Sequence, residues 1–249
     1  MVPAKRVLRL VFLVLCFASI PRIPSTASDL TEALKLRDVA QVRSLLASGE
    51  KVSEKVRGDY PLNIAATYGP AEMVTILLDA GAGLEQPGRD GLHPLHNAVA
   101  LGHRDIVALL IQRGAVIDAR DTLGRTPLYS FAASGGGDIE IAKMLLAAGS
   151  DPRSEEDAFH VTALDNAVET GNLELVELLI AAHADVNHRN VDGWSALHFA
   201  AHHSRYEFVK VLVAAGADVN LPNKLGKTPI SEAPNDIAMQ KLLIEAGAK

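Results

Sequence analysis

Apolar residues recur along the chain in short blocks that have the spacing of one side of a helix. In the blocks 106–110 and 175–179 they occupy positions i, i+1, i+3 and i+4. This spacing predicts helices that bury one face. Each apolar block is expected to follow a shorter helix that is rich in alanine. Examples are the alanine pairs at 65–66 and 200–201. The small side chains of these pairs let neighbouring helices approach closely.

Two short markers repeat along the chain with nearly the same period. The first is a proline or alanine followed by leucine or isoleucine, and it starts at 61, 94, 127, 163, 196 and 229. The second, usually Gly-Ala, starts at 81, 114, 149, 183 and 216. Both markers recur about every 33 residues, and such a shared period predicts a solenoid, in which each unit buries its apolar side against its neighbours.

The residues at the two markers have a conformational reason to be there. Thr126 is expected to cap the first helix of its unit, and Pro127 fits the first helical position, where its missing N–H costs nothing. Glycine at 81, 114 and 216 is expected to end the second helix in the left-handed conformation. The sequence of each unit therefore predicts a helix, a turn, a second helix and a hairpin loop.

Three segments carry a longer motif: His93–Ala98 (HPLHNA), Thr126–Tyr129 (TPLY) and Ser195–Ala200 (SALHFA). Two Ala-Asp-Val-Asn runs, at 184–187 and 217–220, accompany them. Together with the shared period, these motifs resemble the ankyrin repeat. The resemblance covers 29–249 and implies an all-α ankyrin-repeat solenoid over 28–249, with about seven helix-turn-helix units joined by short hairpin loops. The expected units are 29–55, 56–88, 89–121, 122–156, 157–189, 190–222 and 223–249.

The pattern breaks at three places. Residues 134–137 (SGGG) lengthen the connection between the helices of the fourth unit, as a tolerated loop insertion or as a flexible finger beside a binding groove. Residues 150–160 form a longer hairpin with the acidic cluster Glu155, Glu156 and Asp157, which reads as a solvated loop or as a contact for a basic partner. His183 stands in a helix-ending glycine site, where the left-handed conformation costs about 1 kcal/mol. Ser204 likewise replaces the glycine between the helices of the sixth unit.

The segment 1–27 differs from the rest of the chain. Lys5, Arg6 and Arg9 precede an apolar run at 10–20, and small residues end the segment at Ala27. This layout predicts a secretory signal peptide over 1–27, cleaved after Ala27. The run is too short for an ordinary membrane-spanning helix, so no stable membrane insertion is expected after cleavage; a retained anchor is the alternative. The prediction is an exported protein, periplasmic or secreted.

Composition narrows the function. The chain of 249 residues has a net charge of −6, and without the four basic residues of 1–27 the remainder carries −10. An acidic body argues against general nucleic-acid binding, which needs clustered basic residues. The single cysteine, Cys16, lies in the leader, so no disulfide or thiolate metal site is expected in the remainder.

Catalytic, metal and cofactor sites are not predicted. The resemblance assigns His96, His103 and His198 structural roles that tie neighbouring units together. His198 and His202 are four positions apart, which leaves a metal site as an alternative. Aspartates recur near the end of each second helix, and we interpret them as acceptors in turns rather than as calcium ligands: Asp118, Asp151, Asp185 and Asp218. The chain has no Gly-x-Ser-x-Gly motif, and we predict that it is not an enzyme.

The resemblance also implies where a partner would bind. Ankyrin repeats contact other proteins through the hairpin tips and the exposed side of the first helices, and we expect a monomer that binds a protein partner there. The alternative function is a general scaffold or stabiliser of exported proteins. Trp194, His202 and His203 belong to one unit, and protonation of the two histidines could modulate binding there. Trp194 and Tyr68 are included because tryptophan, tyrosine and arginine are favoured at interfaces. The predicted binding residues are Arg57, Asp59, Tyr68, Arg89, Asp90, Leu92, Leu101, Arg125, Asp192, Trp194, His202, His203, Lys224 and Lys227.

Overall fold

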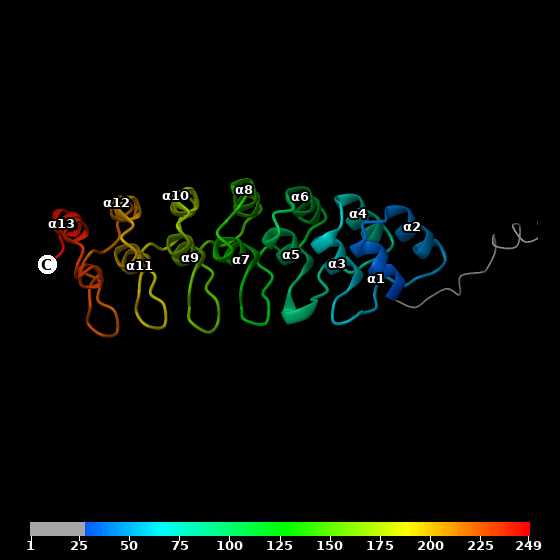
Figure 1. Ribbon diagram of the computed structural model, residues 1–249, viewed down its shortest axis with the longest axis horizontal. Helices are drawn as coiled ribbons and strands as arrows, with labels where there is room; N and C mark the ends of the chain where they lie inside the picture. Colours follow the sequence, from blue (N-terminus) through cyan, green and yellow to red (C-terminus); the bar gives the residue numbers. More distant parts are fainter. Residues whose placement is uncertain (1–27) are drawn as a thin grey trace, which may run out of the picture.

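The computed structural model describes residues 28–249, and this part of the chain is an all-α solenoid, as the repeat pattern predicts (Figure 1). Seven consecutive helix pairs follow one another, and the last pair opens with a short 3-10 helix. The elements are α1 (Ser28–Lys35), α2 (Val39–Ala47), α3 (Pro61–Tyr68), α4 (Ala71–Asp79), η1 (Arg89–Gly91), α5 (Pro94–Ala100), α6 (Arg104–Gln112), α7 (Pro127–Ala133), α8 (Ile139–Ala147), α9 (Ala163–Thr170), α10 (Leu173–Ala181), α11 (Ala196–His202), α12 (Tyr206–Ala214), η2 (Pro229–Glu232) and α13 (Ile237–Glu245).

The helices stack in two rows, with the hairpin loops projecting from one side of the rod (Figure 1). The inner row runs α1, α3, α5, α7, α9, α11 and η2, and each member contacts the next. The outer row runs α2, α4, α6, α8, α10, α12 and α13, again with contacts between neighbours. The two rows bury one continuous apolar core that extends from Leu30 to Leu243. No unit could bury its apolar face alone, because each side of a unit needs a neighbour.

The local signals act as expected from the sequence. The Thr126 hydroxyl accepts a hydrogen bond from the Tyr129 amide at 3.2 Å, and Pro127 is the first residue of α7. Gly81, Gly114 and Gly216 end the outer helices with φ of 87°, 87° and 92°. A β-carbon is disfavoured in this left-handed region, which is why glycine suits these sites.

Two non-glycine residues take glycine positions, as the sequence indicates. His183 has φ of 67° and Ser204 has φ of 52°. His183 nevertheless donates its backbone N–H to Ile180 at 2.9 Å, which completes the same helix ending. The strain of these sites is therefore accepted without a change in the repeat geometry.

The final unit is shortened where Pro234 interrupts the inner helix. Only the 3-10 turn η2 forms, from Pro229 to Glu232, before α13 begins at Ile237. The leader predicted over 1–27 lies outside the described residues. Within 28–249, no helix combines the length and the apolar character that crossing a membrane requires.

Candidate partner-binding surface

One buried or half-buried polar side chain closes each of several hairpin loops from within. The Asp121 Oδ1 accepts the backbone N–H groups of Leu123 and Arg125 at 2.9 and 3.0 Å. Asn190 does the same for Asp192 and Trp194, at 3.0 and 2.9 Å. A short polar side chain that accepts hydrogen bonds from its own loop fixes the turn. The tips are therefore held in one conformation.

Glu156 takes this role in the longer loop where the fourth unit meets the fifth. It is buried, and its carboxylate accepts from the backbone N–H groups of Ala158, Phe159 and Val161. Asp157 pairs with Arg120 at 2.8 Å. The segment is therefore not a simple solvated acidic loop, because its middle carboxylate is an internal anchor.

Neighbouring hairpin tips are also joined to one another. The Asp157 N–H donates to the Leu123 carbonyl at 3.0 Å, and the Val191 N–H donates to the Phe159 carbonyl at 2.8 Å. The Lys224 N–H donates to the Asp192 carbonyl at 2.9 Å. These bonds link the fourth to the seventh unit in one edge, so that a partner would meet a preformed surface rather than separate loops.

The structure brings Arg57, Asp59 and Arg89 together near the amino-terminal end of this edge. The Arg89 guanidinium donates to the Arg57 carbonyl at 2.9 and 2.7 Å, and its Nε lies 3.5 Å from the Asp59 carboxylate. Asp90 is exposed, while Leu92 is only half-buried at the tip. Part of this charged group is thus engaged in joining two hairpins.

Three further predicted residues come from the second, third and fourth units, in that order: Tyr68, Leu101 and Arg125. Tyr68 and Leu101, at the ends of α3 and α5, are exposed to 46% and 52%. Arg125 forms an ion pair with the Asp121 carboxylate at 2.6 Å. Burial by itself would raise the pKa of Asp121, but Arg125 and the backbone N–H donors lower this pKa overall. Arg125 therefore contributes to loop stability as well as to the surface.

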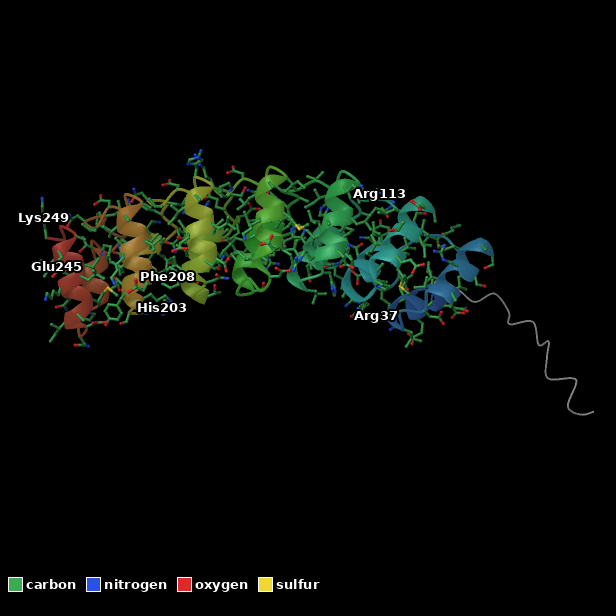
Figure 2. The ribbon with its side chains drawn as sticks, turned by 90° about the horizontal axis from the view of Figure 1, so that it is seen from above. Arg37, Arg113, His203, Phe208, Glu245 and Lys249 are labelled. Carbon is green, nitrogen blue, oxygen red and sulfur yellow. The ribbon has the colours of Figure 1, made fainter. Side chains whose placement is uncertain are left out.

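Trp194, His202 and His203 form one cluster at the carboxyl-terminal part of the surface. The Trp194 ring lies 5.1 Å from that of Phe199 and 5.5 Å from that of His202, and the His202 and His203 rings are 5.1 Å apart. Figure 2 places His203 and Arg37 along one long side of the rod and Arg113 along the other. His203 and Arg37 thus mark the side where inner helices end.

The two predicted lysines lie on the hairpin that follows this cluster in the chain, and its backbone contacts the sixth unit. Lys224 and Lys227 are exposed on the hairpin of the last unit, and the Lys227 Nζ lies 3.9 Å from the Glu232 carboxylate.

Burial, and then the neighbouring His202, lower the pKa of His203. The expected change of charge below about pH 6.5 therefore occurs at lower pH for His203.

The histidines of the repeat motif join adjacent units. The His96 Nε2 lies 2.9 Å from the Arg125 carbonyl, and the His103 Nε2 lies 3.1 Å from the Thr67 carbonyl. In the sixth unit, the His198 Nδ1 is 2.9 Å from the Ser195 hydroxyl and its Nε2 is 3.1 Å from the Lys227 carbonyl. Both nitrogens of this ring are engaged, so His198 has no free nitrogen for a metal shared with His202.

The repeated aspartates behave as turn acceptors. Asp185 and Asp218 each accept a backbone N–H two positions later, at 2.9 Å. Asp118 accepts instead from the next unit, through the Ser150 hydroxyl at 2.6 Å and the Asp151 amide at 2.8 Å. Across 28–249, no three His, Cys, Asp or Glu side chains are arranged to hold a metal ion.

A cluster that was not predicted from the sequence joins the fourth and fifth units. The His188 ring lies between two carboxylates, with Nε2 2.8 Å from Glu155 and Nδ1 3.6 Å from Asp165. His160 contacts the other oxygen of Glu155 at 2.8 Å. Asp165 raises the pKa of His188 to about 9; burial opposes this and Glu155 adds to it. The pKa of Glu155 is lowered by its hydrogen bonds with His160 and His188.

The asparagine Asn172 determines the shape of the glycine-rich insertion. Its amide donates to the carbonyls of Gly135 and Gly136 at 3.1 and 2.9 Å, while its oxygen caps α10 through the Leu175 amide at 3.0 Å. The insertion is therefore attached to the next unit, which favours the interpretation as a tolerated loop over that of a free finger.

Comparisons with known proteins agree with this architecture. The family described as "Ankyrin repeats (3 copies)" matches residues 30–121, 117–190 and 164–249. The human ASB11 ankyrin repeat domain superposes with a TM-score of 0.77 at 24% identity, over 88% of this chain and 98% of that one.

Curated relatives are similar over shorter stretches. The human Notch-regulated ankyrin repeat-containing protein is 60% identical over 40 residues, which are 16% of this chain and 35% of that protein. Mouse protein phosphatase 1 regulatory subunit 12A is 37% identical over 76 residues, 30% of this chain and 7% of that protein. The chain thus spans about a third, or less, of the length of these relatives. Because the family matches nearly all of 28–249, the chain belongs to the ankyrin-repeat family.

Proposed function

We propose that this protein binds a partner protein on its concave face, formed by the hairpin tips and the exposed ends of the inner helices. Ankyrin-repeat domains are generally protein–protein interaction modules. The observation that carries the proposal is the hydrogen-bonded edge of hairpin tips, because fixed loops lower the cost of ordering the backbone on binding. Exposed Tyr68, Leu101 and the Trp194 cluster lie along this face and supply the kind of contact area that interfaces use.

The test places a photo-reactive phenylalanine analogue at Tyr68 or Leu101 in cells of the organism that encodes the protein. Matched positions on the outer helices, Glu177 and Lys210, are exposed and serve as controls. We expect discrete crosslinked adducts from the concave positions and none of comparable yield from the controls. Adducts from Glu177 and Lys210 alone would contradict the proposal.

We further propose that this binding takes place outside the cytoplasm. Support comes from the sequence, in which the basic residues Lys5, Arg6 and Arg9 precede the apolar run at 10–20. The mass of the protein purified from its source tests this point. A chain that begins at Ser28 in an exported fraction is the expected result, and an intact leader on a protein found in the cytoplasm would refute it.

A further inference from the structure

A cleft of about 290 Å³ opens beside the inner helices α9 and α11, where the hairpin of the sixth unit meets them. Its aromatic side consists of Trp194, Phe199 and His202, and its polar side includes Glu169 and Asp192. Three aromatic or imidazole rings and two carboxylates therefore share one small volume. This combination suits an organic cation, which is attracted by aromatic faces and by negative charge.

The aromatic side is fixed in position before any ligand arrives. The Trp194 amide donates to the Asn190 side chain at 2.9 Å, and the Trp194 ring packs 5.9 Å from the His198 ring. His198 is itself tied to the Lys227 carbonyl of the next unit at 3.1 Å. Trp194 remains half-exposed, so part of its ring is available to a ligand.

The two carboxylates have no cationic partner within the described part of the chain. Most of the other acidic groups near the hairpin edge do have one: Asp59 pairs with Arg89, Asp121 with Arg125, and Asp157 with Arg120. Arg205 lies beside Glu169, but its guanidinium donates to the Glu169 backbone carbonyl, at 2.7 Å. The carboxylates of Glu169 and Asp192 are exposed and free to bind an incoming cation.

Burial lowers the pKa of His203, and the adjacent His202 lowers it further, whereas Glu169 raises it. The two carboxylates outnumber the one guanidinium beside them, that of Arg205, so the fixed charge around the cleft is negative. In the other units the residue equivalent to Trp194, two positions before the Pro/Ala-Leu marker, is not aromatic: Asp59, Leu92, Arg125, Val161 and Lys227. The feature belongs to the sixth unit.

We infer that this cleft binds an arginine side chain of the partner protein, with the guanidinium stacked on Trp194 and hydrogen-bonded to Glu169 and Asp192. A guanidinium is planar, stacks on aromatic rings and offers several N–H donors at fixed angles, which matches two carboxylates beside an indole. The more strongly hydrated lysine ammonium fits this geometry less well. The inference deepens the proposed function, on which it rests, by stating what the partner presents at this point.

Trp194 makes the test direct, because it is the only tryptophan in the chain. The probe is the peptide acetyl-Gly-Gly-Arg-Gly-Gly-amide, titrated against the full mature chain while Trp194 fluorescence is followed. Peptides with citrulline or lysine in place of arginine are the comparators. We expect saturable binding of the arginine peptide, and binding at least about tenfold weaker for the uncharged citrulline peptide. The lysine peptide is expected to lie between them.

The variant Glu169→Gln/Asp192→Asn removes both charges while keeping side-chain size. We expect it to weaken the arginine peptide by at least about tenfold, whereas the control Glu177→Gln, on the outer helix α10, leaves binding unchanged. Circular dichroism checks that each variant keeps its helical content. Equal binding of the arginine and citrulline peptides, equal binding of arginine and lysine, or wild-type affinity in the double variant would each overturn the inference.

The two proposals fail separately. If crosslinked adducts form at Tyr68 and Leu101 but the arginine peptide does not bind, the concave face is an interface and the arginine cleft is wrong. If the peptide binds with the expected selectivity but concave positions give no adduct, the cleft recognises a guanidinium, but the proposed binding of a partner protein on this face is wrong.

Discussion

Replacing His188 by glutamine removes a cation held between two carboxylates and keeps a polar side chain of similar reach. In the folded protein Asp165 lies 3.6 Å from one ring nitrogen and Glu155 lies 2.8 Å from the other. Asp165 is almost fully buried, and its carboxylate also accepts from the amide and the hydroxyl of Thr162, at 3.0 and 2.8 Å. The variant leaves a buried carboxylate facing a neutral group.

The size of the effect follows from the pKa of His188, which rises from 6.5 to about 9 on folding. At about 1.36 kcal/mol per pKa unit, and with partial screening by solvent, the rise corresponds to roughly 2 to 3 kcal/mol of stability. Because the folded-state pKa is the higher one, this stabilisation is complete below about pH 6.5 and disappears as the pH rises through about 9. Relative to the wild type, His188→Gln should therefore be strongly destabilised at about pH 6. At about pH 10 the loss of this charge should destabilise it little.

The assay is urea unfolding of the wild type and the variant at several pH values, followed by far-UV circular dichroism and Trp194 fluorescence. The difference in unfolding free energy between the two proteins cancels the titration of other groups. His202→Gln is the matched control, since the exposed His202 forms no ion pair within 28–249. A difference between wild type and His188→Gln that stays constant from about pH 6 to about pH 10 would refute the reasoning.

Substitutions at three other positions test the loop geometry, two of them by urea unfolding and the third by amide hydrogen exchange. His183→Gly relieves the left-handed conformation at φ of 67° and should stabilise by about 1 kcal/mol; no gain would contradict the strain. Glu156→Ala leaves three backbone N–H groups of its loop without their acceptor and should destabilise by roughly 2 to 3 kcal/mol, whereas Glu156→Gln should cost less. Asn172→Asp keeps the cap of α10 but loses the donor to Gly135 and Gly136, so amide hydrogen exchange should speed up in that loop and not in α10; equal acceleration in both would contradict the assignment.

The repeat architecture is predictable from sequence because its determinants are local and periodic. A threonine that caps a helix, a glycine that ends one and a histidine at the fourth position of the motif act within one unit or on the next. His96 and His198 take the same role in two units, and both contact the following hairpin. The cluster of Trp194, His202 and His203 could be predicted from the sequence for the same reason, since all three residues belong to one unit.

The missed cluster depends on contacts between units that differ from the common pattern. Asp165 stands at the motif position that His96 and His198 occupy in other units. His188 approaches it from the hairpin that follows in the sequence. A carboxylate in place of the motif histidine was the available signal, but the position of a partner on another loop depends on three-dimensional geometry.

The acidic segment shows why charge alone was insufficient. Glu155, Glu156 and Asp157 are adjacent in sequence, yet one is buried among backbone donors and the other two form separate ion pairs. The longer loop places its N–H groups where the longer glutamate side chain reaches them. Conformation, rather than composition, assigns each carboxylate its role.

The most direct test of the proposed binding face is amide hydrogen exchange of the protein, with and without the partner that crosslinking identifies. We expect slower exchange on binding in the hairpin tips, including 190–194, and at the ends of the inner helices α3, α5 and α11. Slower exchange confined to the outer helices α4, α6, α8, α10 and α12 would contradict the claim that this protein recognises its partner through the concave face.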